Sequence, residues 1–437
     1  MESVWQKNTT KPNFQSLIGV KNTDVLIIGG GIAGILCAHK LKNAGINCIL
    51  TEADTICSGV TQNTTAKITL QHGAMFDQLI KRFGSEKARL YVEAQKIAGA
   101  SIAELCRDIE CDYESKDSYV YSLSNRNKIE KEQQALNTLD INAEFVNTSE
   151  LPFEIAGAVR VKKQAQFHPL KFLYSVAQGL PIYEHSKIIG LKPNKAVTNQ
   201  GEIRYKKLII ATHFPMINKH GGYFAKLYQH RSYVIALKNA KKISGMYVDA
   251  SDTGLSFRSD GNFLLLGGGG HRTGKQGGGW KELENFAKQH FHNAKIVAKW
   301  ATQDCMTLDE IPYIGQYSQA MPDIYVATGF NKWGMTNSMV SAEILCDLIQ
   351  GKFNRYAELF SPSRSIFHPQ LFTNTFESIL GLLTPTAPRC PHLGCALKYN
   401  REEHSWDCPC HGSRFSENGT LIDNPATDDH LSIQKRG

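Results

Sequence analysis

The sequence predicts an α/β protein that ends in a small cysteine-rich module. Near the N-terminus, a short apolar run over residues 24–28 leads into a glycine-rich turn and then an amphipathic stretch over residues 35–44. A second apolar run follows at residues 46–50. This order of strand, turn, helix and strand predicts a parallel β-α-β unit. The last fifty residues contain two short Cys/His boxes in loops rich in glycine and proline, which is typical of a metal site.

Length and composition limit the possible classes of protein. The 437 residues suggest two or three domains, and a content of 42% hydrophobic and 21% charged residues is ordinary for a globular chain. The net charge of +8 is modest and the lysines are dispersed, so nothing indicates binding to nucleic acid. The N-terminus lacks the basic start and apolar core of a signal peptide, and no apolar run approaches the roughly 18 residues of a membrane span. We expect no transmembrane segment and a cytoplasmic location.

The glycine-rich turn has the spacing of a dinucleotide-binding fingerprint. Gly29 permits a tight turn, Gly31 lets a pyrophosphate approach the backbone at the helix N-terminus, and Gly34 allows close packing of helix on strand. Glu52, eighteen residues beyond Gly34, ends the second strand, where a carboxylate accepts hydrogen bonds from ribose hydroxyls. A purely structural turn is the alternative. The fingerprint predicts a Rossmann-type domain without distinguishing FAD from NAD.

The C-terminal boxes offer two thiolates and two imidazoles. Cys390 and His392 form a C-x-H pattern, Cys408 and His411 form a C-x-x-H pattern, and each box holds one further cysteine, Cys395 or Cys410. A zinc site is the alternative, but C-x-H spacing is uncommon in zinc knuckles, and zinc would give no role to the two further cysteines. A Rieske [2Fe–2S] centre needs two cysteines and two histidines, and the boxes resemble that family.

The resemblance to Rieske proteins implies a role for each of these residues. Cys390 and Cys408 would bind one iron, His392 and His411 would bind the other, and Cys395 and Cys410 would form a disulfide that joins the two ligand loops. A small all-β module is implied as well.

Two neighbouring residues bear on the cluster potential. Ser413 stands where Rieske proteins place a hydroxyl that hydrogen-bonds a bridging sulfide, and Phe415 stands where the high-potential members have Tyr. Because one hydrogen bond to the cluster is then missing, we expect a potential within the Rieske range of about −150 to +300 mV but below its top.

Four separated segments, 59–67, 186–191, 208–212 and 309–336, resemble the glycine/D-amino acid oxidase (DAO) superfamily of flavoproteins in their order. The resemblance implies FAD as the cofactor. His213 stands where the family has glycine. The implied contacts are Gly59, Thr61, Asn63 and Thr64 near the ribityl chain and ring, Ile188 at the adenine, Ala211 and Thr212 at the pyrophosphate, and Gly329, Gly334, Met335 and Thr336 at the pyrimidine end.

The same resemblance gives the expected organisation of the chain. An FAD-dependent oxidoreductase would span residues 20–355, followed by a linker over 356–387 and a reduced Rieske module over 388–437 that docks on the flavoprotein body. The FAD part would use residues 20–85, 152–215 and 306–355, interleaved with an α+β substrate part over residues 86–151 and 216–305.

The substrate would be a small amine or amino-acid-like molecule. Several family members carry Arg where this chain has Asp304, and a carboxylate there would favour a cation. A structural ion pair is the alternative for Asp304. We expect an FAD-dependent dehydrogenase that passes electrons through the cluster to an external one-electron acceptor, protein or carrier. A flavin and iron–sulfur redox sensor or electron carrier without turnover is the alternative. Further candidates for the pocket are Arg231, Tyr233, His271 and Arg272.

Overall fold

A six-stranded sheet forms the dinucleotide-binding part. The computed structural model describes residues 2–7, 9–218, 220–251, 254–365, 368–385 and 388–430. Five strands of the sheet are parallel and its edge strand β18 is antiparallel, in the order β18-β19-β12-β2-β3-β8. All six come from the three segments that we expected to form the FAD part. They are β2 (Val25–Ile28), β3 (Cys48–Thr51), β8 (Ile182–Tyr183), β12 (Lys207–Ile210), β18 (Tyr313–Ser318) and β19 (Met321–Thr328).

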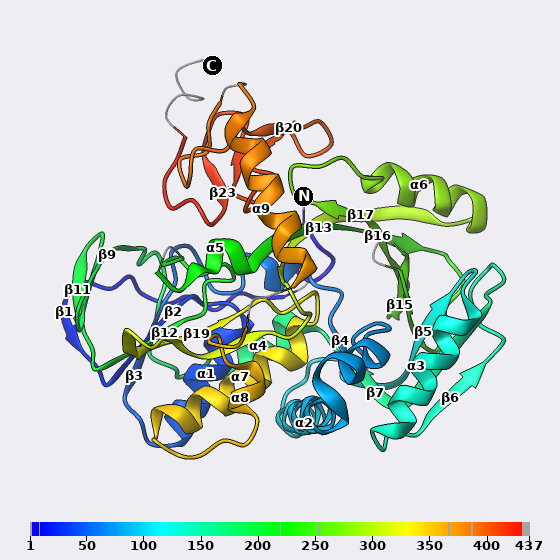
Figure 1. Ribbon diagram of the computed structural model, residues 1–437, viewed down its shortest axis with the longest axis horizontal. Helices are drawn as coiled ribbons and strands as arrows, with labels where there is room; N and C mark the ends of the chain where they lie inside the picture. Colours follow the sequence, from blue (N-terminus) through cyan, green and yellow to red (C-terminus); the bar gives the residue numbers. More distant parts are fainter. Residues whose placement is uncertain are drawn as a thin grey trace.

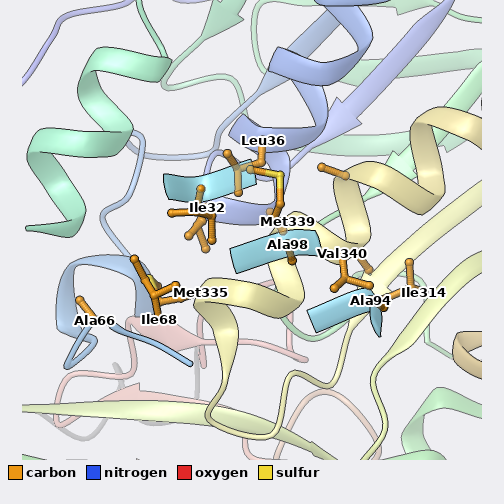
Figure 2. Close-up of a cluster of buried hydrophobic side chains, with 14 of the residues drawn as sticks. Ile32, Leu36, Ala66, Ile68, Ala94, Ala98, Ile314, Met335, Met339 and Val340 are labelled. Atoms are coloured by element: carbon orange, nitrogen blue, oxygen red, sulfur yellow. The ribbon is translucent and has the colours of Figure 1, made fainter. Parts of the chain in front are cut away.

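Two helices pack against this sheet, a third packs on one of them, and all three share one core. Every residue of β2 is buried, as expected for a parallel strand covered on both faces. The helices α1 (Ile32–Asn43), α2 (Phe76–Leu105) and α7 (Gly334–Ile349) pack together there, and Figure 2 shows their apolar side chains meeting. Leu36, Ala98 and Met339 are fully buried in this cluster. Burial of each large aliphatic side chain contributes roughly 1.5–3 kcal/mol, so this core, which extends into the nine-stranded sheet described next, contributes much of the stability of the body.

A nine-stranded sheet forms most of the other half of the body. Its order is β17-β13-β16-β15-β14-β5-β7-β4, and β6 pairs with β7. Strands β4 and β7 come from segments expected in the FAD part, so the two parts share a border. The strands are β4 (Lys67–Ile68), β5 (Glu114–Ser122), β6 (Ala143–Val146), β7 (Gly157–Gln166), β13 (Leu227–Lys238), β14 (Met246–Asp249), β15 (Ser256–Asp260), β16 (Phe263–Arg272) and β17 (Lys295–Thr307), accompanied by α3 (Arg126–Thr138) and α6 (Gly279–His290).

Smaller elements complete the body. A four-stranded sheet has the order β1-β11-β10-β9. Its strands are β1 (Gly19–Asn22), β9 (Ile188–Lys192), β10 (Lys195–Thr198) and β11 (Gly201–Arg204), and the short helical elements are η1 (Val60–Asn63), α4 (Pro169–Val176), η2 (His220–Gly222), α5 (Tyr223–Lys226) and α8 (Ala357–Phe360). Within the described ranges, no helix is long and apolar enough to cross a membrane.

The C-terminal module is a four-stranded antiparallel sheet, β20 (Lys398–Asn400), β21 (Ser405–Asp407), β22 (Arg414–Ser416) and β23 (Leu421–Asp423). Figure 1 shows it in orange and red above α5 and β13 of the body. The expected linker contains α9 (Pro369–Leu383), whose Gly381 lies against the module: a Cβ there would lie 2.5 Å from Cys410 Sγ. Residues 386, 387 and 431–437, which belong to the predicted linker and module, lie outside the described residues.

Candidate functional site

The glycine-rich turn between β2 and α1 is built so tightly that larger residues do not fit. Gly29 has φ +111°, and a Cβ on it would lie 2.5 Å from the carbonyl oxygen of Ala211. A Cβ on Gly34 would lie 1.9 Å from the carbonyl oxygen of Gly29. The helix that follows has neither a side-chain cap nor an acidic residue in its first turn. Its N-terminus therefore favours an anion such as a pyrophosphate.

Glu52 closes the far side of this turn. Its carboxylate accepts hydrogen bonds from the backbone N–H groups of Gly30 (2.7 Å) and Asp54 (3.0 Å). Burial raises the pKa of Glu52, and these hydrogen bonds partly offset that effect. The side chain also lines the cavity described next, where ribose hydroxyls can donate to it.

A cavity of about 1280 Å³ opens beside the turn. Its volume exceeds the roughly 300–1,000 Å³ of most small-molecule sites, as an extended dinucleotide and a second ligand would require. Two of the fifteen predicted cofactor residues are not among the lining residues: Gly34 packs inside the turn, and Thr336 lies 3.0 Å from His72 Nε2. The other thirteen line the cavity, namely Gly29, Gly31, Glu52, Gly59, Thr61, Asn63, Thr64, Ile188, Ala211, Thr212, Gly329, Gly334 and Met335.

Titratable side chains that we did not name as candidate site residues also line this cavity. Lys67 is buried, and burial followed by the charge of Arg258 lowers its pKa to about 7. Burial lowers the pKa of His72 to about 3 and that of His230 to about 3, so both rings are neutral at neutral pH. His230 Nδ1 is buried and has no hydrogen-bond partner among the described residues. Lys67 ends the predicted segment 59–67, whereas nothing in the local sequence distinguishes His72 and His230 from ordinary polar positions.

Asp304 lines the same cavity. It is directly paired with His230 across β13 and β17, and Ser232 Oγ donates to its carboxylate at 3.3 Å. Burial raises the pKa of Asp304, while the charges of Lys332 and His213 act in the opposite direction. Such a carboxylate gains most from a ligand that brings a positive charge.

The other candidate pocket residues lie mainly at the contact with the C-terminal module. Strand residues alternate between faces, and in β13 His230 and Ser232 line the cavity whereas Arg231 points to the module. The Arg231 guanidinium forms a buried ion pair with Glu403. Tyr233 lines the cavity, yet its hydroxyl donates to Glu403 at 2.9 Å.

His271 and Arg272 complete this contact. His271 Nε2 lies 3.0 Å from the Tyr233 hydroxyl. Arg272 donates to the carbonyl oxygens of Pro409 (3.3 Å) and Cys410 (3.2 Å) in the second Cys/His box. Arg231 and Arg272 therefore contact the module directly, whereas His271 contacts Tyr233, and none of the three is among the residues that line the cavity.

The two Cys/His boxes fold as a matched pair of loops. The N–H of Gly394 donates to the Cys390 carbonyl and that of Gly412 to the Cys408 carbonyl, both at 2.9 Å. Gly394 (φ +79°) and Gly412 (φ +91°) both adopt the left-handed conformation that such turns need. Cys390, Cys408 and His411 are buried and His392 is half-buried; the two cysteines contact each other, and so do the two histidine rings.

The donor set fits a [2Fe–2S] cluster. Cys390 and Cys408 lie within hydrogen-bonding reach of each other, and the His392 and His411 rings are 5.0 Å apart. His411 Nδ1 is buried and, in the described part of the chain, has no hydrogen-bond partner. Burial, then the charge of Arg272, lowers the pKa of His411 to about 4, so its ring is the neutral form that binds metal.

The predicted disulfide partners are close together. The sulfur atoms of Cys395, Cys408 and Cys410 all lie within 4.8 Å of one another, although the structure holds every cysteine as a free thiol. The Cys395–Cys410 disulfide therefore stays a prediction. The Ser413 hydroxyl lies in hydrogen-bonding contact with Cys390 and accepts from the Ala426 N–H at 3.0 Å, and its bond to a sulfide stays a prediction too.

The module also forms part of the cavity wall, through residues that follow β22. Leu421, Ile422 and Asn424 line the same cavity as the glycine-rich turn. Two glutamines of the body bind backbone carbonyls of the module. Gln303 donates to the Gly412 carbonyl in the second box at 2.9 Å, and Gln229 donates to the Asn424 carbonyl after β23 at 3.0 Å. The module is thus docked directly on the body, as expected.

A glycine-rich β-α-β turn that opens on a large cavity, beside a buried Cys₂His₂ loop pair, defines a nucleotide-cofactor oxidoreductase with an iron–sulfur centre. Comparison with known proteins identifies the family. Residues 24–348 match the FAD dependent oxidoreductase (DAO) family and residues 379–434 match the Rieske [2Fe-2S] domain. The chain belongs to the DAO family of FAD-dependent oxidoreductases and carries a C-terminal Rieske domain, so FAD and a [2Fe–2S] cluster are its cofactors.

Three relatives illustrate the match. YhfW of Bacillus subtilis (strain 168), which is named as a Rieske 2Fe-2S iron-sulfur protein, is 33% identical over 97% of this chain and 96% of its own length. Gamma-glutamylputrescine oxidoreductase of Escherichia coli (strain K12) is 22% identical over 78% of this chain and 86% of its own. The structure of L-proline dehydrogenase from P. horikoshii shares the fold, with TM-score 0.67 and 18% identity over 79% of this chain and 98% of that one.

Proposed function

We propose that the protein is a dehydrogenase that oxidises a small amine or amino-acid-like substrate in the cavity and delivers the electrons to an external one-electron acceptor. One observation carries this proposal: residues of the cluster module line the same cavity as the cofactor residues. Bound FAD supplies two-electron oxidation, and a Rieske cluster supplies one-electron transfer. The cavity, large enough for a second ligand, favours an enzyme over a sensor without turnover.

The side chains at the substrate end of the cavity support an amine as the substrate. Asp304 supplies a half-buried carboxyl group, and neutral His230 supplies a ring nitrogen in the same cavity. A cationic amine would pair with Asp304, and His230 can accept a hydrogen bond from its N–H group. Lys67, at the same cavity, can pair with a carboxylate while it is protonated. The cavity wall thus contains one acidic and one basic side chain, the two kinds of partner that an amino-acid-like amine needs.

The cluster site would be held by Cys390 and Cys408 on one iron and by His392 and His411 on the other. Local backbone hydrogen bonds close the two loops that carry these four side chains. Cys395 and Cys410 would join the two loops through a disulfide. With Phe415 buried beside the loops in place of a hydroxyl-bearing ring, we expect the potential to stay below the top of the Rieske range.

Anaerobic mixing of the purified holoprotein with a panel of amines and amino acids tests the proposal. Loss of flavin absorbance, followed by the EPR signal of a reduced cluster, would identify the substrate and support transfer to the cluster. Bleaching of the flavin without any cluster signal, even with an artificial one-electron acceptor present, would contradict the route. Reduction only by a carrier protein would favour the sensor or electron-carrier alternative.

A variant of Asp304 tests the substrate class. We expect Asp304→Asn to lower kcat/KM for the best cationic amine by about tenfold to a hundredfold, since a hydrogen bond to a charged group contributes roughly 1.5–3 kcal/mol. A neutral analogue should lose much less. Asp323→Asn, at an exposed position of β19, serves as the control. Equal losses for charged and neutral substrates would contradict the role of Asp304.

A further inference from the structure

One loop of the body contacts both sites. We call residues 211–218 the bridging loop. It begins where β12 ends, and Ala211, Thr212, His213 and Met216 line the cofactor cavity. At its other end Asn218, which is 5% exposed, places Oδ1 2.7 Å from Nε2 of His392. A short stretch of backbone therefore joins the cavity to a histidine of the cluster site.

The direction of the bond between Asn218 and His392 follows from its neighbours. Asn218 Nδ2 donates to the carbonyl oxygen of Pro215 at 3.3 Å, so its amide nitrogen is already engaged. The end that faces His392 is the amide oxygen, which can only accept. His392 Nε2 must then carry the proton and donate it, which leaves Nδ1 as the nitrogen that can bind iron.

Further hydrogen bonds fix the bridging loop against the module. Asn424 of the module donates through Nδ2 to the carbonyl oxygens of Thr212 (2.8 Å) and Phe214 (2.6 Å). His213 Nε2 lies 3.1 Å from Gln229 Oε1, and Gln229 in turn donates to the Asn424 carbonyl. The position of Asn218 relative to His392 is therefore set by several contacts and does not depend on one bond.

We propose that Asn218 is a positioning residue for the cluster and that, through it, the flavoprotein body lowers the cluster's reduction potential. An acceptor on the outer nitrogen makes an imidazole a stronger donor to its metal. A stronger donor stabilises the oxidised iron more than the reduced iron, so the potential falls. The inference rests on the proposed ligand set, in which His392 binds iron.

Redox titration of the holoprotein, followed by the EPR signal of the reduced cluster, tests this role without any substrate. Asn218→Leu removes the acceptor and should raise the potential. Asn218→Asp has nearly the same shape and offers a stronger, charged acceptor, so it should lower the potential. Asn262→Asp adds the same charge at an exposed turn distant from the module and should leave the potential unchanged. Iron content and flavin absorbance show that each variant keeps both cofactors.

Opposite shifts for the two Asn218 variants support the proposal. Potentials equal to that of the wild type, or two shifts in the same direction, overturn it. If Asn218→Leu fails to retain iron, Asn218→Asp decides alone, and an unchanged potential in that variant overturns the proposal. Failure of the ligand set has a separate readout: His392→Ala would then keep full iron content and an unaltered EPR spectrum.

Discussion

The dinucleotide-binding part and the C-terminal module bury very different kinds of side chain. The former shares a core of dozens of buried aliphatic and aromatic residues with the neighbouring nine-stranded sheet. Among the described residues of the module, the buried apolar cluster has seven members, and four of them are the cysteines of the two boxes. A core of that size contributes too little apolar burial to hold a fold by itself, so metal binding and docking must stabilise the module.

The contact between the two regions is correspondingly polar. Glu403 of the module lies between Arg231 of the body and Arg414 of its own sheet, and all three side chains are at least nine-tenths buried. Arg414 also pairs with Asp407 and Asp423. Charge pairing orients the module, whereas apolar packing holds the body together. The two regions should therefore respond differently to the loss of a metal ligand, of an ion pair and of a buried lysine.

Loss of the cluster is expected to give the largest difference in stability between the module and the body. Cys408→Ser removes a proposed iron ligand, and because metal binding and folding are coupled in small metal domains, the module should lose its iron and its protection from proteolysis. The body should keep FAD, since its core does not use the cluster. Iron analysis, EPR and flavin absorbance measure both outcomes. Cys346→Ser changes a buried thiol of α7 and should keep both cofactors. Joint loss of FAD and iron in Cys408→Ser would contradict independent stability of the body.

A smaller effect is expected from the interface ion pairs. Glu403→Ala leaves Arg231 and Arg414 buried without their shared partner, a change that typically costs about 3–5 kcal/mol. The module should then detach before the body unfolds, so that limited proteolysis releases it while FAD stays bound. Glu417→Gln, which removes an exposed pair with His404 in the same module, should leave the cleavage pattern unchanged. Equal cleavage of both variants would show that charge pairing does not hold the module.

Candidate site residues that lie close together in the sequence could be predicted from their spacing. The face of a strand on which a residue such as Arg231 lies could not. Gly29, Gly34 and Glu52 act within one β-α-β unit, and the Cys/His boxes close on themselves through local backbone bonds, so their spacing was sufficient. Arg231 was expected in the pocket, but a shift of one position along β13 separates the cavity face from the module face. Local sequence cannot assign that face in a strand covered on both sides.

The bridging loop shows a second limit of the same kind. Asn218 has no motif of its own, and its contact with His392 joins positions 174 residues apart. The sequence of the expected linker likewise did not predict that Gly381 of α9 would lie against Cys410. Contacts of this kind depend on how two folded parts meet, and that geometry is decided by the whole interface and not by any segment.

The smallest predicted effect concerns Lys67, which the core of the body buries at the cavity. Its pKa falls to about 7 in the folded protein, against about 10.4 for an unfolded chain. Between these values the unfolded state binds more protons, so the free energy of unfolding contributed by this residue rises with pH, and its penalty is complete below pH 7. Lys67→Met has no such titration. The stability advantage of Lys67→Met over the wild type should therefore be greatest at pH 6 to 7 and shrink by up to about 1.4 kcal/mol per pH unit towards pH 9.

Urea unfolding of the holoproteins at several pH values measures this difference, with Lys281→Met, an exposed lysine of α6, as the control. A difference that stays constant with pH would mean that Lys67 keeps its proton in the folded core, and the cavity would then hold a permanent positive charge where a substrate carboxylate could bind.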